Sequence, residues 1–191
     1  MFSPKIKKEE IMEFFELVKK RRSVRSYLPQ AVEKEKIVRC IEAARLAPSA
    51  CNSQPWKFIV VDNPELKSKI AKATCDKILS FNHFSFQAPV IVAVVTEKAN
   101  LSATLGRVIK KIPYQYIDTG IAVEHFCLQA TEEGLGSCIL GWFNEKAVKK
   151  ILKIPFNKKV TLLITVGYPE KDEIVEKNRK PVEDILSFNS Y

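Results

Sequence analysis

The chain has 191 residues, of which 46% are hydrophobic and 28% charged, and its formal net charge at pH 7 is +9. This length supports one hydrophobic core, and the composition excludes a disordered chain. The positive charges are spread along the sequence, and no zinc-finger spacing or aromatic RNA-binding strand motif accompanies them, so we expect no nucleic-acid partner.

The spacing of apolar residues predicts an amphipathic helix over residues 9–20 with one buried face. Its apolar residues are Ile11, Phe14, Phe15 and Val18. Residues 21–27 follow as an extended segment. Further helices are predicted by the same periodicity over residues 33–47, 65–79, 114–133 and 145–152, and a short one over 182–188. We expect residues 97–113 to form a mobile helix and loop.

Short apolar runs rich in β-branched residues predict the strands. These runs are residues 57–61, 88–95 and 160–166, with a short extended piece at 137–140. The run 88–95 is nearly continuous, as expected of a strand covered on both faces. Helices around a few buried strands indicate an α+β layered domain. The glycine-rich motifs of Rossmann and P-loop nucleotide folds are absent from the sequence.

The connection from Pro48 to Trp56 joins an amphipathic helix to an apolar strand and is the most informative stretch of the chain. Its polar residues are Ser49, Asn52, Ser53 and Gln54. Two prolines stiffen this backbone, and rigid polar loops commonly hold ligands. Cys51, also in the loop, is interpreted as a small side chain and not as a nucleophile.

Two basic segments are candidates for an anion site. In an extended strand Arg21, Ser23 and Arg25 share one face, and arginine binds phosphate through a planar donor fork. A solvated helix end is the alternative for the first segment. The second segment, 177–181, reads by itself as a solvated tail, but beside Arg21 it would complete an anion site.

The sequence offers little protein acid–base machinery. His83 and His125 are the only histidines, and neither a catalytic triad nor a zinc site follows from their spacing. The five cysteines form no Cys-x-x-Cys pair, so reduced thiols and no metal are expected. The N-terminal residues lack a signal-peptide core, and the apolar runs are too short to span a bilayer. We therefore expect a soluble, cytoplasmic protein with no membrane partner, whose chemistry is carried by a cofactor.

Five motifs, in this order, resemble those of the FMN-dependent nitroreductase family. They are Arg21-Arg22-Ser23-Val24-Arg25, Pro48-Ser-x-x-Asn52-x-Gln54-Pro55-Trp56, Gly134-Leu135-Gly136 with Ile139-Leu140-Gly141, Gly167-Tyr168-Pro169, and Lys177-x-Arg179. The resemblance covers about residues 14–186. It implies a single domain over 1–191 with a mixed or antiparallel sheet wrapped by helices, and a homodimer with two FMN sites at its interface. The tail, about residues 168–191, is then expected to pack on the partner subunit.

The resemblance also implies which residues contact FMN. They are Arg21, Arg22, Ser23, Arg25, Pro48, Ser49, Ala50, Asn52, Gln54, Asn82, Ile139, Leu140, Gly141, Lys177 and Arg179.

Within that set, the resemblance places Arg21, Lys177 and Arg179 at the phosphate, Ser23 at the ribityl chain or phosphate, and Arg25 over the pyrimidine edge of the flavin. Pro48, Ser49 and Asn52 reach the flavin of the other subunit, and the backbone of Leu140 and Gly141 faces the flavin N5 and O4. Some relatives carry a glutamate at the position of Leu140. Small residues on the helix 114–133, Gly120 and Ala122, permit the close helix approach of an intimate dimer.

The activity implied is that of an FMN-dependent oxidoreductase. NADH or NADPH delivers hydride to flavin N5, and a small electron-poor acceptor (a nitroaromatic, a quinone or an activated alkene) then takes it in a ping-pong scheme. No protein residue is expected to be catalytic in itself. The alternatives are a specialised enzyme of the same fold with another donor or substrate, including dehalogenation, and a non-catalytic flavin- or anion-binding protein.

Overall fold

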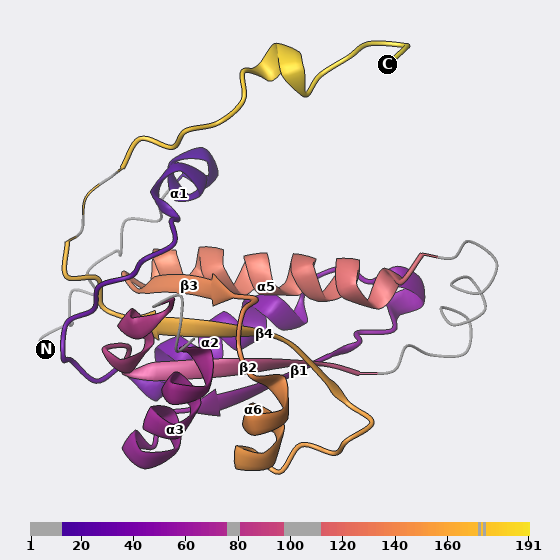
Figure 1. Ribbon diagram of the computed structural model, residues 1–191. Coiled ribbons are helices and arrows are strands. Elements are labelled where there is room, and N and C mark those ends of the chain that lie inside the picture. Colours follow the sequence, from indigo (N-terminus) through magenta and orange to yellow (C-terminus); the bar gives the residue numbers. More distant parts are fainter. Residues whose placement is uncertain (1–12, 76–80, 98–111, 172, 174) are drawn as a thin grey trace, which may run out of the picture.

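The computed structural model describes residues 13–75, 81–97, 112–171, 173 and 175–191 (Figure 1). Its centre is a four-stranded sheet in the order β1-β2-β4-β3, in which every neighbouring pair is antiparallel. The strands are β1 (Trp56–Val61), β2 (Val90–Thr96), β3 (Gly136–Leu140) and β4 (Lys159–Gly167). All residues of β2 are buried, as its β-branched run predicts. Of the mixed and antiparallel sheets that the family resemblance allows, the chain has the antiparallel one.

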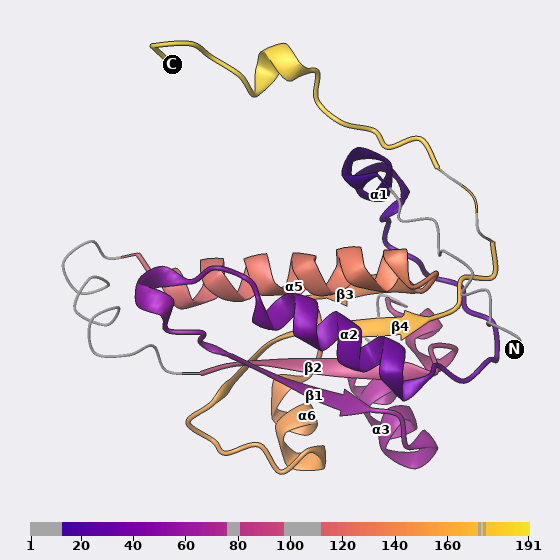
Figure 2. The same ribbon diagram turned by 180° about the vertical axis from the view of Figure 1, so that it is seen from behind.

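Helices cover both faces of this sheet (Figures 1 and 2). They are α2 (Lys34–Arg45) and α5 (Tyr114–Glu132) on one face, and α3 (Pro64–Thr74) and α6 (Glu145–Ile151) on the other. Side chains of β2 alternate accordingly: Val92 packs with the first pair of helices, and Ile91 with the second. The predicted α+β layered fold is confirmed.

The extended segment 21–27, which we call the strap, covers the outer edge of β3. Ser23 bridges Ser137, and the Val24 N–H donates to the Ser137 carbonyl oxygen at 2.9 Å. Gly136 makes this close approach possible, because a Cβ added there would lie 2.7 Å from Cγ2 of Val24. The Val24 side chain is itself buried, so it has little room to move away.

Gly136→Ala is therefore expected to destabilise the chain by about 1–3 kcal/mol, the usual cost of overpacking. Urea unfolding, followed by circular dichroism in the absence of flavin, measures this change. Gly141→Ala is the matched control, because nothing lies within 4 Å of a Cβ built at that position. Equal stability of the two variants would contradict the packing argument.

Two predicted helices differ from the observed ones. The first, α1 (Phe14–Lys20), has no buried residue, with Phe14 67% and Phe15 68% exposed, so the expectation of a buried face is wrong within this chain. The segment 182–188 contains only the short turn η3 (Val182–Asp184). Residues 9–12 and 76–79 of the predicted helices, and nearly all of 97–113, lie outside the described residues.

The outward face of α5 is apolar. Ile117 is 51% and Ile121 36% exposed, and Gly120 lies between them on the surface. Ala122 is fully buried in the chain's own core, so the prediction that it serves helix approach between subunits is wrong.

The C-terminal tail leaves the body near α1 and extends away from it (Figures 1 and 2). Residues 178–191 are exposed throughout. No helix within the described ranges is both long and apolar enough to cross a membrane.

Candidate functional site

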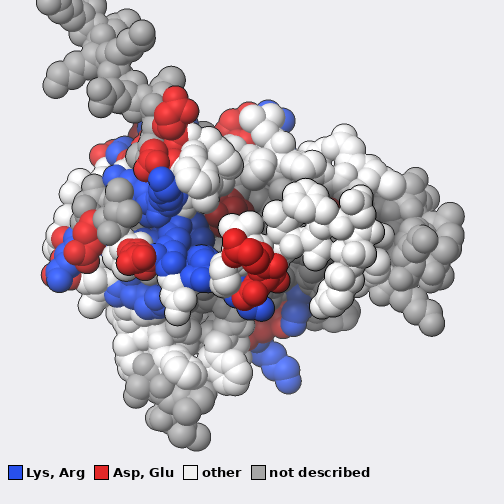
Figure 3. All heavy atoms as spheres, turned by 90° about the horizontal axis from the view of Figure 1, so that it is seen from above, with Lys and Arg blue, Asp and Glu red and all other residues white. Residues whose placement is uncertain are grey.

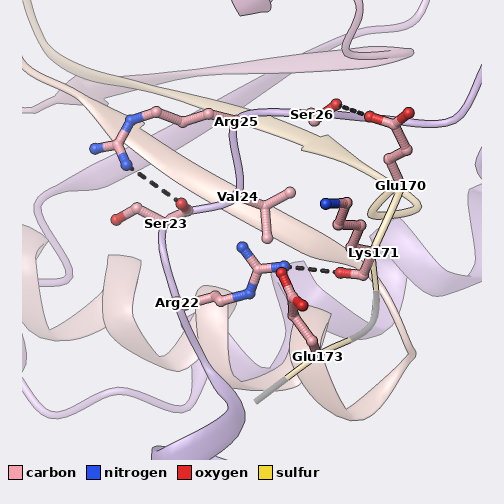
Figure 4. Close-up of a pocket in the computed structure, with 8 residues that line it drawn as sticks. All are labelled: Arg22, Ser23, Val24, Arg25, Ser26, Glu170, Lys171 and Glu173. Atoms are coloured by element: carbon pink, nitrogen blue, oxygen red, sulfur yellow. Dashed lines mark hydrogen bonds between the residues drawn. The ribbon is translucent and has the colours of Figure 1, made fainter. Parts of the chain in front are cut away.

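A cavity of about 430 Å³ lies along the strap (Figure 4). Its walls are Arg22, Ser23, Val24, Arg25, Ser26, Glu170, Lys171 and Glu173. Side chains alternate along the extended backbone: Ser23 and Arg25 leave it on the side opposite to Lys171, as Figure 4 shows. Arg22 points toward that segment and donates through Nη2 to the Lys171 carbonyl oxygen at 2.7 Å. Arg22 thus fastens the strap to the chain that follows β4.

On the other side of the strap, three of the predicted cations come together. Lys177 donates to the Val18 carbonyl oxygen at 2.5 Å, which brings the tail to the end of α1 beside Arg21. Partial burial lowers the pKa of Lys177, and the positive charges of Arg21 and Arg179 lower it further, while Glu124 opposes them. Arg179 is exposed, and its Nη1 donates to the carbonyl oxygen of Asn178 at 2.8 Å. We call Arg21, Lys177 and Arg179 the cation cluster. Viewed from above, lysine and arginine side chains gather in the middle of this face, with acidic side chains around them (Figure 3).

The cation cluster brings three positive charges together. Its described carboxylate neighbour is Glu124 on α5, whose Oε1 lies 3.2 Å from Nε of Arg21. Like charges held close together lower the free energy of binding an anion, because the anion relieves their repulsion. The charge of the cluster is therefore suited to an anion, and whether it binds a phosphate stays a prediction.

Ser23 and Arg25 lie against β3. Arg25 donates through Nη1 to the Ser23 carbonyl oxygen at 3.4 Å. Burial raises the pKa of the Cys138 thiol, while the charge of Arg25 and a hydrogen bond with the Ser23 side chain lower it. These influences place both strap residues beside the middle of β3.

At the end of β3, Ile139 is 36% exposed and Gly141 is also exposed, whereas Leu140 is buried. The Leu140 side chain packs in the core with α3 and α6. Only its backbone is left to meet a ligand.

The flavin contact of Asn82 stays a prediction, and its side chain also makes contacts within the chain. Its Nδ2 donates to the carbonyl oxygens of Trp142, at 3.1 Å, and Thr74, at 3.3 Å. The amide therefore fastens the segment after β3 to the end of α3. Trp142, 60% exposed, follows Gly141 directly and was not among the sequence candidates.

The backbone of the polar loop 48–56 has an unusual conformation. Cys51, Asn52 and Gln54 have φ values of 52°, 49° and 44°, a region that non-glycine residues seldom occupy. The Gln54 N–H donates to Oγ of Ser49, and Gln54 Nε2 donates to Oδ1 of Asn52, both at 3.0 Å. The polar side chains of the loop thus hold one another.

Asp118 anchors this loop to α5 and was missed by the sequence analysis. Its Oδ1 accepts the N–H of Ala50 at 3.2 Å, and the residue is only 5% exposed. Its Oδ2 is buried without a hydrogen-bond partner within the described part of the chain. The available signal was an acidic residue inside an otherwise apolar helical stretch.

The strap and the polar loop lie toward opposite ends of α5 (Figures 1 and 2). The loop meets the first turns through Asp118, whereas Arg21 meets the helix farther along at Glu124. The structure therefore brings the strap, the cation cluster and β3 together in one chain. Pro48, Ser49, Ala50, Asn52 and Gln54 stay apart from them.

His125 on α5 has a contact with the neighbouring helix α2. Nδ1 of His125 lies 3.2 Å from the Ala43 carbonyl oxygen and links α5 to α2. No group of three or more metal-ligating side chains is found among the residues that the structure describes.

Comparisons with known proteins agree with this architecture. The model of the nitroreductase family matches residues 18–168. A protein of Archaeoglobus fulgidus named "Putative NADH dehydrogenase/NAD(P)H nitroreductase" is 33% identical over 167 residues, covering 84% of this chain and 87% of that protein. Iodotyrosine deiodinase 1 of Sus scrofa is 31% identical, covering 91% of this chain and 68% of its own length.

Among solved structures, an FMN-dependent nitroreductase from Clostridium difficile is 29% identical with a TM-score of 0.76, covering 93% of this chain and all of that one. The family match spans the strap, the polar loop and all four strands, and it ends at residue 168, before Lys177 and Arg179. By sequence and by fold, the chain belongs to the nitroreductase family.

Proposed function

We propose that this chain is an FMN-dependent NAD(P)H oxidoreductase that reduces a small electron-poor acceptor. The observation that carries the proposal is the cation cluster, in which Arg21 of the strap and two residues of the distant tail gather at the end of α1. Family membership adds independent support, because a solved relative of the same fold is an FMN-dependent enzyme. The name of the Archaeoglobus relative supports NADH or NADPH as the electron donor.

The described residues divide the binding of FMN between them. Arg21, Lys177 and Arg179 hold the phosphate through charge-assisted hydrogen bonds. Ser23 meets the ribityl chain or the phosphate, and Arg25 stabilises negative charge at the pyrimidine edge of the ring system. The backbone from Ile139 to Gly141 faces the rings, and the burial of the Leu140 side chain, which leaves its backbone as the group available to a ligand, supports this assignment. FMN, when bound, supplies the hydride-transfer chemistry.

A homodimer is the second part of the proposal. Apolar side chains are exposed on three separate elements of the chain: Phe14 and Phe15 on α1, Ile117 and Ile121 on α5, and Val182, Ile185, Leu186 and Phe188 on the tail. Exposed apolar groups of this extent favour burial against another chain. In such a dimer the polar loop of one subunit contributes Pro48, Ser49, Ala50, Asn52 and Gln54 to the flavin of its partner, which accounts for its distance from the strap.

A visible absorption spectrum, recorded before and after anaerobic addition of NADH or NADPH, tests the redox function. We expect a purified protein with the two absorption bands of oxidised flavin, bleached by at least one of the two donors. Air or a nitroaromatic should then restore the bands. A protein that stays colourless after incubation with FMN would contradict the proposal, and one that binds FMN without being bleached would indicate either another electron donor or the non-catalytic alternative.

Reductive dehalogenation is a second candidate for the same site. The observation in its favour is the similarity to the deiodinase of Sus scrofa over most of this chain. Turnover of a halogenated phenol and of a nitroaromatic, measured with one reductant and one enzyme preparation, distinguishes the two acceptors. Halide release faster than nitro reduction would favour dehalogenation.

A further inference from the structure

Glu124 lies within the proposed phosphate site. Its carboxylate oxygen Oε1 is 3.2 Å from Nε of Arg21, and its charge also acts on Lys177. The Arg21 side chain is 21% exposed, and that of Glu124 is 44% exposed. Glu124 therefore reaches the cluster from the surface of α5, and its carboxylate contacts a guanidinium assigned above to the phosphate.

A carboxylate and a phosphate compete for the same donors. Both are anions that accept charge-assisted hydrogen bonds from the planar fork of arginine. An incoming phosphate dianion must displace the Glu124 carboxylate from Arg21 or bind beside it, and in both cases the carboxylate opposes binding. Because the Glu124 side chain is almost half exposed, the ion pair contributes little to folding stability. The main effect of the ion pair is therefore on the affinity of the site for an anionic ligand.

We propose that Glu124 is an internal competitor of the phosphate group of FMN, which sets the affinity of the cation cluster for flavins that carry a phosphate. This inference rests on the proposed function. It assigns to Glu124 a specific effect: the residue weakens the binding of FMN and leaves the binding of riboflavin, which has no phosphate, unchanged.

The test compares two flavins on one pair of proteins. We expect Glu124→Gln to bind FMN about three- to tenfold more tightly than the parent chain, the range expected for loss of one partly exposed charge contact. Its affinity for riboflavin should stay the same. Quenching of flavin fluorescence on titration with apoprotein measures both dissociation constants. The gain for FMN should shrink as salt is added, because salt screens the charge of a partly exposed carboxylate.

Glu42→Gln is the matched control. It removes the same charge from the surface of α2, where Glu42 pairs with Arg45 and both side chains are more than half exposed. This control should leave the affinity for both flavins unchanged, which separates a local effect from a change in net charge. In an Arg21→Ala background the effect of Glu124→Gln on FMN should be reduced, because the contested donor is gone.

The possible results distinguish the role of Glu124 from the proposed function on which it rests. Tighter FMN binding with unchanged riboflavin binding supports the inference. FMN binding that is unchanged or weaker in Glu124→Gln overturns it, and so does an equal gain for FMN and riboflavin. If the parent chain binds no FMN, the proposed function fails and the inference fails with it, whereas FMN binding by the parent with no effect of Glu124→Gln overturns the inference alone.

Discussion

Arg21→Ala is expected to weaken FMN binding about ten- to a hundredfold, which corresponds to about 1.5–3 kcal/mol for a lost hydrogen bond to a charged group. Arg21 holds a central place in the cation cluster, next to Lys177 and in contact with Glu124. Riboflavin binding should change little, because the lost contact is to the phosphate alone. Titration of apoprotein with each flavin, followed by fluorescence, provides the measurement.

Arg179→Ala should act in the same direction, because Arg179 belongs to the same cluster. Arg45→Ala is the control: Arg45 is an equally charged residue on α2 and pairs with Glu42 outside the site. Unchanged FMN affinity in both Arg21→Ala and Arg179→Ala would show that the phosphate binds elsewhere. Equal losses for FMN and riboflavin would indicate a general disturbance of the strap.

Removing the tail after Lys180 is expected to dissociate the proposed dimer. The truncation keeps Lys177 and Arg179 and deletes Val182, Ile185, Leu186 and Phe188, all of which are at least 48% exposed. Burial of one large apolar side chain contributes about 1.5–3 kcal/mol, so losing four should raise the dimer dissociation constant by about a thousandfold or more. Sedimentation velocity over a range of protein concentrations measures this change.

The tail truncation has its own control and its own contrary result. Deletion of residues 189–191 removes the end of the chain and keeps the four apolar residues, so the dimer should persist. The fold of the truncated chain should be intact, because the deleted side chains are exposed in the single chain. A dimer of unaltered stability after truncation, or a full-length chain that is monomeric, would contradict the role of the tail.

Local patterns predicted the core of this fold well, and surfaces less well. The β-branched run ending at Val95 identified the central strand, because a strand covered on both faces must be apolar throughout. Helical periodicity identified α1 as amphipathic but could not say what covers Phe14 and Phe15. Periodicity reports only that an apolar face exists, and the covering surface can belong to another chain.

The residues of the candidate site that belong to a family motif could be predicted from the sequence. Arg21 and Lys177 were paired through the family resemblance, since no local pattern links residues so far apart in sequence. Glu124 and Asp118 were not predicted. An acidic residue on a helix usually faces solvent, and only the folded chain shows that Glu124 meets a cation and that Asp118 holds the Ala50 N–H.

The position of the strap also affects how readily the protein aggregates. An edge strand exposes unpaired N–H and C=O groups that can recruit another chain into a growing sheet, and β3 is such an edge. The Ser23–Ser137 bridge and the Val24 hydrogen bond occupy part of that edge. The segment that presents Ser23 and Arg25 to a ligand therefore also guards against aggregation. Variants that loosen the strap should be less soluble and should bind the cofactor more weakly. Flavin added during purification should reduce aggregation.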